Sequence, residues 1–381
     1  MSVNKDATHR LPLWSWAGPL FAALWLGVAF APGFTVTPLL WNSVAALALT
    51  VSVFASVHHA EIIALRVGEP LGSLLLAVAV TIIEVALIVS ILLSGVPGSE
   101  YVARDTVYSA VLIVLNGVVG LGLVLGGRRH FEQSFRSDGV AAALAVLGTL
   151  ATIALVFPNY VTAVRGPLYS PGQLLFVGIV SLILYCVFVF VQTVRHRDYF
   201  TESEIDDYAE HAPDERPSLR MSLVSGCLLL VSLTLVVLLS KRLSIPISSL
   251  IETAGLPSSF LGVVIAIIVL LPESLAALRA ARANRLQSSL NLAIGSAIAS
   301  IGLTIPTVAI LSVWKDLPLP LGLQPHETVL LVLTLFISTL TLGTGRTTVL
   351  HGAVHLVIFG VLSSSSGARS EHSGIAMGQR G

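Results

Sequence analysis

Apolar runs of about 20 residues recur along the whole chain, separated by short polar segments. A run of this length is what an α-helix needs to cross a bilayer, because each helical residue adds only about 1.5 Å along the axis. Of the 381 residues, 55% are hydrophobic and 11% are charged, whereas soluble domains carry about 25% charged residues. The sequence therefore predicts an all-α integral membrane protein.

Eleven of these runs are predicted to be membrane-spanning helices. The first lacks the small-residue cleavage pattern of a secretory signal, so we interpret it as a helix that stays in the protein. The expected spans are Pro12–Phe34, Leu39–Val67, Pro70–Gly95, Thr106–Gly127, Gly139–Tyr160, Pro171–Val194, Leu219–Ser240, Pro257–Ala281, Leu286–Trp314, Glu327–Leu342 and Thr347–Leu362.

Lys and Arg residues fall unevenly between the two sides of the predicted membrane. With the N-terminus in the cytoplasm, the cytoplasmic segments carry 14 of them and the outer loops carry 5. Cytoplasmic loops retain positive charge, so this count predicts a cytoplasmic N-terminus and an outer C-terminus. The 21 basic and 21 acidic residues balance overall. No net field favours nucleic acid as a partner, and the expected surroundings are the lipid bilayer.

Two of the predicted spans contain a single glutamate deep within an apolar run. Glu84 is the only charged residue between Glu69 and Glu100, and Glu273 directly follows Pro272. Inserting an acidic side chain at mid-span costs roughly 2.5–3.5 kcal/mol. Such residues typically mark ion or proton pathways, and we favour this interpretation over a purely structural acid at both positions.

An acidic segment between the sixth and seventh spans divides the chain. Leaving the first helix aside, five spans lie on either side of it, and an odd number per half means that the halves enter the membrane from opposite sides. We therefore predict two inverted repeats with an ion site at the midplane, where Glu84 and Glu273 face one another. The predicted organisation is an N-terminal helix at 1–37, a first inverted repeat at 38–195, an acidic cytoplasmic linker at 196–217, a second inverted repeat at 218–362 and a disordered tail at 363–381.

Other oxygen ligands accompany the two glutamates. Pro272 has no amide hydrogen for the carbonyl of Ile268, which leaves that oxygen available to a cation. Thr81 lies one turn before Glu84 and offers a hydroxyl on the same helical face. Such oxygens suit a hard cation such as Ca²⁺, and two carboxylates held close in a dry site also take up protons. The sequence therefore predicts a secondary antiporter without a cofactor, which exchanges a cation for H⁺.

Further polar residues lie near the predicted helix ends. His59, Glu61, Glu69 and Glu252 are candidates for a gate or a proton path, and a polar contact at the helix end is an alternative for the first two. A zinc site that also includes His58 is the weaker interpretation, because the HExxH spacing is absent. The acidic linker has two interpretations as well, a solvated connection and a patch that concentrates or senses cations.

Two stretches give the chain a resemblance to a known family. They are VHHAEIIALRVGEPLGSLLLAVAVTIIEVALIVSILL, at 57–93, and LLPESLAALRAARANRLQSSLNLAIGSAIASIGLTIP, at 270–306. Both are similar to the α-repeats of bacterial ChaA-type calcium/proton antiporters, in the cation/proton exchanger branch of the calcium/cation antiporter superfamily. The resemblance extends along nearly the whole chain. It implies a multi-pass protein of the bacterial inner membrane.

The resemblance also implies roles for particular residues. Glu84 and Glu273 match the essential carboxylates, which bind the metal cation and protons in turn. Polar residues of the helices that follow them, here Asn116 in the first half and Asn291 and Ser296 in the second, would complete the site.

The sequence departs from the wider family at this site. Eukaryotic members carry a Gly-Asn pair before each glutamate, whereas the pairs here are Val80-Thr81 and Val269-Leu270. Because two amide ligands are missing, exchange of Na⁺ or K⁺ for H⁺ is an alternative to Ca²⁺/H⁺ exchange. An intramembrane enzyme is the less favoured class, since GxSxG and HExxH motifs are absent, and a passive channel is a further alternative.

Overall fold

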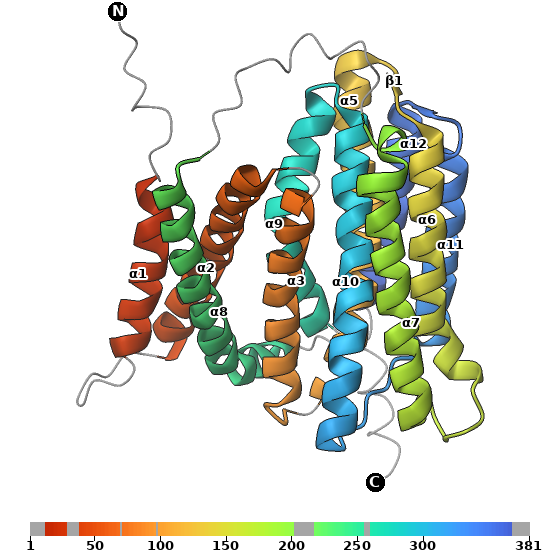
Figure 1. Ribbon diagram of the computed structural model, residues 1–381. Coiled ribbons are helices and arrows are strands. Elements are labelled where there is room, and N and C mark those ends of the chain that lie inside the picture. The colour runs from red at the N-terminus through yellow and green to blue at the C-terminus, as the bar shows by residue number, and fades with distance from the viewer. Residues whose placement is uncertain are drawn as a thin grey trace, which may run out of the picture. The chain divides into compact units, whose positions relative to one another are not determined.

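The computed structural model describes residues 12–28, 38–68, 71–96, 98–201, 217–254 and 260–367, and these are mostly helical (Figure 1). In chain order the α-helices and strands are α1 (Leu13–Val28), α2 (Pro38–Val67), α3 (Leu71–Leu92), α4 (Val102–Leu112), α5 (Val119–His130), β1 (Gln133–Ser134), α6 (Ser137–Ala151), α7 (Pro171–Phe190), α8 (Leu219–Thr253), α9 (Phe260–Arg282), α10 (Leu286–Lys315), α11 (Pro325–Leu342), β2 (Arg346–Thr347) and α12 (Val349–Gly367).

Three π-helical segments continue some of these α-helices. A π-helical turn has one residue more than an α-helical turn, so it changes the direction of the side chains around it. The first segment joins α4 to α5 and contains Asn116. The segments are Ile113–Val118, Thr152–Val156 and Val191–Arg195, and short 3₁₀ turns lie at Ser99–Tyr101, Phe157–Tyr160 and Arg197–Tyr199.

Nine helical stretches within the described residues are long and apolar enough to cross a membrane. One of them, Ser99–His130, combines α4, the first π-helical segment and α5. The first and last helices contribute shorter apolar segments, Leu13–Val28 and Val349–Ser363. The predicted helical membrane class is thus confirmed. Each expected span overlaps one of these segments, and the count of eleven crossings stays a prediction.

The chain packs into two compact units that are not continuous in sequence. Unit 1 consists of Met1–Ser90 and His211–Pro246, and unit 2 consists of Ile91–Glu210 and Ile247–Gly381. The boundaries fall inside helices, near the end of α3 and at Pro246 in α8. Packing therefore groups the helices differently from the two halves of the sequence, and the predicted inverted repeats stay a prediction about internal symmetry.

In unit 1, α1 packs along α2. His59 Nε2 lies 3.1 Å from the carbonyl oxygen of Ser15. Gly18 permits the close approach of the two helices, since a Cβ at that position would lie only 2.6 Å from Val51 Cγ1. The first helix is therefore an integral part of this unit.

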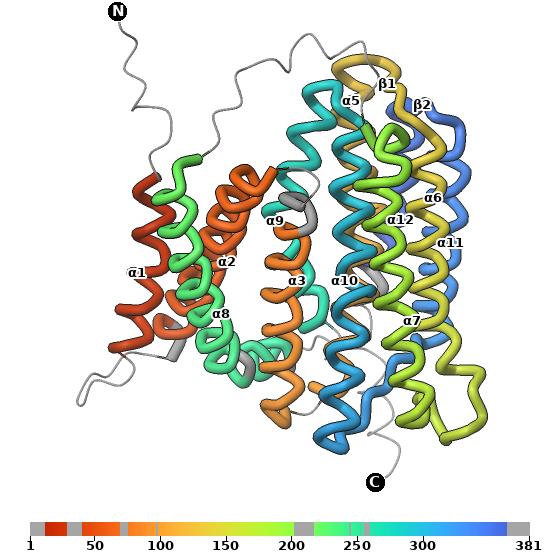
Figure 2. The backbone as a smooth tube through the Cα atoms, in the orientation of Figure 1, coloured from red at the N-terminus to blue at the C-terminus, as the bar shows by residue number. Residues whose placement is uncertain are grey.

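In unit 2, α10 packs against α6, α7 and α9 (Figure 2). Helix α4 packs against α9, and α5 packs against α12. Two crossings bring backbones together. A Cβ on Gly262 of α9 would lie 2.6 Å from Asp105 Cβ of α4, and one on Gly352 of α12 would lie 2.6 Å from the carbonyl oxygen of Gly120 in α5. Small residues at such crossings allow close helix packing without a side chain in between.

Polar contacts join the loops at one end of unit 2. β1 pairs with β2 in antiparallel fashion, with Gln133 opposite Thr347 and Ser134 opposite Arg346. Gln133 Nε2 also donates to the carbonyl oxygen of Ala281, 2.9 Å away at the end of α9. The loops after α5 and before α12 therefore lie at the same end, as the predicted alternation of spans requires.

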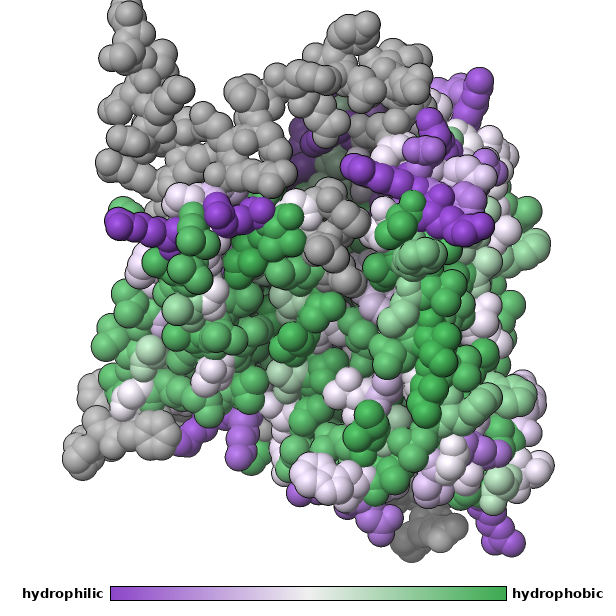
Figure 3. All heavy atoms as spheres, in the orientation of Figure 1, coloured by the Kyte–Doolittle hydropathy of each residue, from purple (hydrophilic) through white to green (hydrophobic). Residues whose placement is uncertain are grey.

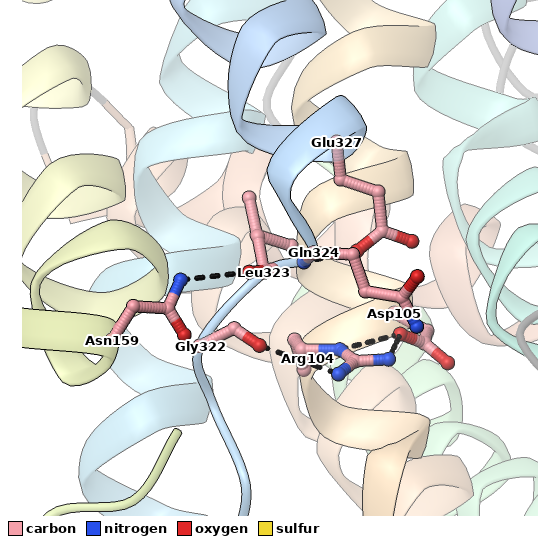
Figure 4. Close-up of polar contacts among 7 residues, drawn as sticks. All are labelled: Arg104, Asp105, Asn159, Gly322, Leu323, Gln324 and Glu327. Carbon is pink, nitrogen blue, oxygen red and sulfur yellow. Dashed lines mark hydrogen bonds and ion pairs between the residues drawn. The ribbon is translucent and has the colours of Figure 1, made fainter. Parts of the chain in front are cut away.

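A buried ion pair holds the segment before α11 at the opposite end of unit 2 (Figure 4). Arg104 Nη2 lies 2.7 Å from Asp105 Oδ1, and Arg104 Nη1 donates to the carbonyl oxygen of Gly322 at 3.3 Å. Asn159 Nδ2 donates to the next carbonyl oxygen, that of Leu323, at 2.7 Å. The start of α4 and the 3₁₀ turn Phe157–Tyr160 are thereby tied to the chain that leads into α11.

Local contacts also define the starts of α11 and α7. Pro325 occupies the first turn of α11, where its missing amide hydrogen would have no helical partner, and Glu327 Oε2 accepts from the amide of Gln324 at 2.9 Å. Just before α7, the Tyr169 hydroxyl donates to the carbonyl oxygen of Ile153 at 2.6 Å. Burial raises the pKa of Tyr169 to about 12, so the hydroxyl keeps its hydrogen at physiological pH.

Two helices extend beyond their expected ends. The seventh span was expected to end at Ser240, but α8 continues through Lys241 and Arg242 to Thr253. Long basic side chains reach solvent from a helix without breaking it. The last helix continues to Gly367, so residues 363–367 belong to α12 and not to the expected disordered tail. The Ser363 hydroxyl there donates to the carbonyl oxygen of Phe359 at 3.0 Å.

The sides of both units are mainly hydrophobic on the face shown in Figure 3, and hydrophilic residues gather towards the helix ends. Helix α7 has an exposed apolar stripe made of Phe176, Ile179, Ile183, Val187 and Phe190. These residues recur every three or four positions and therefore lie on one side of the helix. A long exposed apolar face of this kind is suited to lipid contact.

Candidate ion-binding site

Glu273 lies on the buried face of α9, with an exposed fraction of 9%. Val269 and Ala277, one turn before it and one turn after it, share this face. Ser296 of the adjacent α10 donates its hydroxyl hydrogen to Glu273 Oε2. The structure therefore brings together two of the residues that we expected at the ion site.

Pro272 lies inside α9, which continues as one helix on both sides of it. Because proline has no amide hydrogen, the carbonyl of Ile268 lacks its usual helical partner four residues later. In a helix, carbonyl groups point along the axis towards the C-terminal end. The Ile268 oxygen is therefore directed towards the turn that carries Glu273.

Glu84 lies on the buried face of α3 in unit 1, with an exposed fraction of 4%. Thr81 is buried on the same face three residues earlier, whereas Ile82 between them is 48% exposed. The Thr81 hydroxyl donates to the carbonyl oxygen of Ala77 at 2.9 Å. Its oxygen keeps its capacity to accept a hydrogen bond or to bind a cation.

The side chain of Asn291 has its partners elsewhere. Its amide nitrogen donates to the carbonyl oxygen of Phe200, and its amide oxygen accepts from Gln287 Nε2 at 2.9 Å. Asn291 and Ser296 are five residues apart on α10, which turns their side chains about 140° away from each other. Asn291 therefore fastens the segment after α7 to α10, while Ser296 contacts Glu273.

The side chain of Asn116 has its partners on α11 and α12. It is fully buried in the first π-helical segment. Its Nδ2 donates to Thr334 Oγ1 of α11 at 2.8 Å, and its Oδ1 lies 3.2 Å from Nδ1 of His355 in α12. Sequence reasoning assigned no role to His355, because 239 residues separate it from Asn116. The one indication of a role in the sequence was that His355 is a histidine within a largely apolar span.

The histidines of α2 contact their surroundings in different ways. A carbonyl oxygen only accepts, so His59 Nε2 carries a hydrogen and donates it to Ser15 of α1. His58 Nδ1 lies 3.9 Å from Oε2 of the exposed Glu61. The contact of His59 joins two helices, and the gate or proton path that we expected for His59 and Glu61 stays a prediction.

Some expected features cannot be located. Glu69, residues 202–216 of the acidic linker and the tail from 368 onwards lie outside the described residues, and so does the side chain of Glu252 in α8. Within the part of the chain that the structure describes, no group of three or more His, Cys, Asp or Glu side chains is arranged to hold a metal ion.

The sodium/calcium exchanger protein family matches residues 37–194 and 224–366 of this chain. These two segments together cover more than half of the 381 residues. The match begins after α1, and its interruption contains residues 202–216 of the acidic linker.

Three named bacterial proteins are similar to this chain. It is 56% identical over 352 residues to the putative ionic transporter y4hA of Sinorhizobium fredii (strain NBRC 101917 / NGR234), covering 92% of this chain and 95% of the relative. It is 36% identical over 319 residues to the sodium-potassium/proton antiporter ChaA of Escherichia coli (strain K12), covering 84% and 86%. It is 29% identical over 318 residues to a Ca(2+)/H(+) antiporter of Aphanothece halophytica, covering 79% and 83%.

The fold is similar to that of a solved membrane transporter. The structure of native YfkE superimposes with a TM-score of 0.69 at 19% sequence identity, and the match covers 93% of this chain and 98% of YfkE. At this identity the likeness supports the fold and not the substrate.

Proposed function

The chain belongs to the sodium/calcium exchanger protein family and is a multi-pass cation/proton antiporter, and we propose that its cation is Ca²⁺, bound in turn with protons at Glu84 and Glu273. The surroundings of Glu273 carry this proposal. A buried carboxylate that accepts a hydrogen bond from Ser296, next to the turn where Pro272 frees a carbonyl, offers several oxygen atoms at one point between α9 and α10.

The chemistry of these oxygens suits a divalent cation. Ca²⁺ binds six to eight oxygen ligands at about 2.3–2.6 Å. The proposed ligands are the two carboxylates, the Ile268 carbonyl oxygen and the hydroxyl oxygens of Ser296 and Thr81. When protons bind the carboxylates, the negative charge that holds the cation is lost, so cation and protons displace each other. With two carboxylates, we propose that one Ca²⁺ exchanges for two H⁺.

We further propose eleven crossings in two inverted repeats, with the N-terminus in the cytoplasm of a bacterial cell and the chain in its inner membrane. The asymmetry of basic residues in unit 2 supports this orientation. The end with the β1–β2 pairing carries Arg128, Arg129, Arg136, Arg195, Arg197, Arg279, Arg282, Arg285 and Arg346, and the opposite end carries Arg104, Arg165 and Lys315.

Exchange of Na⁺ or K⁺ for H⁺ is a second candidate that two specific observations favour. The Escherichia coli relative, at 36% identity, is a sodium-potassium/proton antiporter. This chain also has Val80-Thr81 and Val269-Leu270 where amide ligands were expected from the wider family. Fewer oxygen ligands favour a less demanding monovalent cation.

Purified protein in proteoliposomes tests both candidates. Ca²⁺, Na⁺ and K⁺ are supplied in turn, and the proton movement that each drives is followed with a trapped pH indicator. We expect Ca²⁺ to drive proton movement, and we expect Glu84→Gln and Glu273→Gln each to abolish it. Glu132→Gln is the matched control, because Glu132 is an exposed acid paired with Arg346.

The outcomes separate the parts of the proposal. Retained exchange in both glutamate variants would overturn the proposed site. Proton movement with Na⁺ or K⁺ but not with Ca²⁺ would assign the protein to the second candidate. Exchange of one Ca²⁺ for two H⁺ moves no net charge across the membrane. If the ion gradients at which exchange stops depend on membrane voltage, this stoichiometry is excluded.

A further inference from the structure

Unit 2 contains a buried polar cluster on helices other than those that carry Glu84 and Glu273. It consists of Asn116, Thr334 and Thr341 of α11, and His355 of α12, and we name it the His355 cluster. Thr341 is 7% exposed and the other three residues are fully buried. A polar side chain in an apolar bundle costs free energy unless it is hydrogen-bonded, and ionisable groups in such places typically serve ion or proton movement.

The hydrogen bonds determine which nitrogen of His355 always carries a hydrogen. Asn116 Nδ2 donates to Thr334 Oγ1 at 2.8 Å, and this directs the amide oxygen towards His355 Nδ1, 3.2 Å away. An amide oxygen can only accept, so Nδ1 donates in both protonation states of the ring. Nε2 is therefore the atom that gains or loses a proton.

Thr341 can serve both states of Nε2. Its Oγ1 lies 2.8 Å from Nε2 of His355 and 2.8 Å from the carbonyl oxygen of Ile337. When Nε2 has no hydrogen, the hydroxyl donates to it. When Nε2 is protonated, it donates to Oγ1, and the hydroxyl hydrogen turns to the Ile337 carbonyl. Rotation of one O–H bond thus accommodates the proton, whereas a purely structural histidine needs partners for only one state.

The backbone around the cluster is closely packed. A Cβ on Gly120 would lie 2.8 Å from His355 Cβ, so glycine lets α5 approach α12 at this point. Asn116 lies in the π-helical segment Ile113–Val118, whose extra residue alters the direction of the side chains in that turn. Segments of this kind are frequent at functional sites, and here the segment aims the amide at α11 and α12.

A third hydroxyl extends the polar face of α11. Ser338 lies four residues after Thr334 and three before Thr341, so the three side chains share one side of the helix. Ser338 is fully buried, and its Oγ has no hydrogen-bond partner among the described residues. An unpaired hydroxyl in the same row as the partners of His355 can accept a hydrogen bond from a proton donor and pass a proton on by releasing its own hydrogen.

The charged and titratable groups on the helices around His355 lie towards the helix ends. Within the described residues, none of them hydrogen-bonds to His355, so a proton on Nε2 would be the one formal charge in the cluster. These groups are His351 on α12 itself, Arg128, Arg129 and His130 at the end of α5, Arg346 in β2, and His326 and Glu327 at the start of α11.

We propose that the His355 cluster is a second proton-binding site of the antiporter, at which Nε2 takes up and releases a proton during exchange. The proposal rests on the cation/proton antiport described above and adds a proton site to it, while the cation stays with the glutamates. The step is the addition of H⁺ to the lone pair of Nε2. The ring charge changes from 0 to +1, and no other bond is made or broken.

The dependence of exchange on pH tests the proposal. Rates are measured in proteoliposomes with Ca²⁺, Na⁺ or K⁺ over about pH 4 to 9, so that the range includes the titration of a buried histidine as well as that of an exposed one. We expect His355→Gln to lose one ionisation from the wild-type curve, while the cation concentration for half-maximal exchange changes less than about twofold. His196→Gln is the control, because the His196 ring stacks on Tyr199 beyond the end of α7 and has no contact with the cluster, and it should keep the wild-type curve.

A second pair of variants examines Thr341. Thr341→Val removes the oxygen that accepts from protonated Nε2, so we expect the midpoint of the rate curve to move to lower pH by about one to two units. Thr339→Val is the matched control, since the Thr339 hydroxyl is exposed and bonds to the Leu335 carbonyl of its own helix. The midpoint should not move in this control.

A direct measurement covers the case in which a variant fails to fold. In wild-type protein with ¹⁵N-labelled histidine, nuclear magnetic resonance should show one buried ring whose Nε2 titrates while its Nδ1 stays protonated. An Nε2 that keeps a single state, or a His355→Gln curve that superimposes on the wild-type curve, would overturn the proposal. If the wild type exchanges none of the three cations, the proposed function fails, and the titration still decides whether His355 binds a proton.

Discussion

The hydroxyl group of Ser296 on α10 donates a hydrogen bond to Oε2 of Glu273 on α9. A hydrogen bond to a carboxylate orients it and compensates for part of the cost of burying its charge. The contact therefore fixes the orientation of the Glu273 carboxylate, the proposed ligand of the cation. The other residues on this face of α9 are apolar.

Removal of this hydroxyl should weaken cation binding more than it weakens the fold. We expect Ser296→Ala to raise the cation concentration for half-maximal exchange about tenfold, because a hydrogen bond to a charged group contributes about 1.5 kcal/mol. Thr307→Val on the same helix is the control, since the exposed Thr307 hydroxyl bonds only to the Leu303 carbonyl, at 2.8 Å. Equal cation dependence in wild type and Ser296→Ala would show that the contact has no part in binding.

Replacement of Pro272 should raise the stability of the protein and lower its transport activity. Pro272→Ala restores the amide hydrogen to the Ile268 carbonyl, so we expect the free energy of unfolding in detergent to rise by about 1–3 kcal/mol. Cation-driven proton movement should fall, because that carbonyl is no longer available. Pro306→Ala in the neighbouring helix α10 is the control and should leave the cation dependence unchanged. Normal transport by a stabilised Pro272→Ala variant would exclude Ile268 as a ligand.

The Arg104–Asp105 pair should matter for stability because it is buried. Asp105→Asn leaves the guanidinium of Arg104 without its counter-charge, and we expect a loss of about 3–5 kcal/mol in the free energy of unfolding. The exposed pair of Arg346 and Glu132, with 3.3 Å between Nη1 and Oε1, provides the comparison. Glu132→Gln should cost less than about 1 kcal/mol. Thermal unfolding in detergent, followed by circular dichroism, measures both, and similar losses would contradict the expectation.

The crossing of α5 and α12 should tolerate no side chain at Gly352. A Cβ there would lie 2.6 Å from the Gly120 carbonyl oxygen and 2.7 Å from Val124 N, so the two backbones would have to separate. We expect Gly352→Ala to lower the free energy of unfolding by about 1–3 kcal/mol. Gly360→Ala lies on the same helix in open space and should be neutral or slightly stabilising. If both variants behave alike, the crossing is not closely packed.

His59 should prove to be an anchor for α1. Its Nε2 donates to Ser15, 3.1 Å away, so His59→Phe should lower the free energy of unfolding by about 1 kcal/mol through the loss of this bond. The pH dependence of exchange should be unchanged. A changed pH profile with unchanged stability would instead support the gate or proton path that the sequence suggested for this residue.

Most of the helical architecture could be predicted because membrane spans are a local property. Hydropathy over about 20 residues decides whether a segment enters a bilayer, and the expected spans overlap the described helices throughout. The ends were predicted less well. α8 continues past Lys241 and Arg242 to Thr253, and α12 includes residues 363–367, because neither charge nor serine content stops a helix whose backbone hydrogen bonds continue.

The sequence by itself determined the membrane class, the positions of the spans and the two lone carboxylates, because hydropathy and the cost of an intramembrane charge depend on neighbouring residues in the chain. Only the tertiary structure decided which polar residues meet. Ser296 contacts Glu273, Asn291 contacts Phe200, and Asn116 contacts His355. A rotation of about 100° per helical residue, together with the π-helical turn around Asn116, directs each side chain to its partner. These pairings arise from helix packing and have no signature in residue spacing.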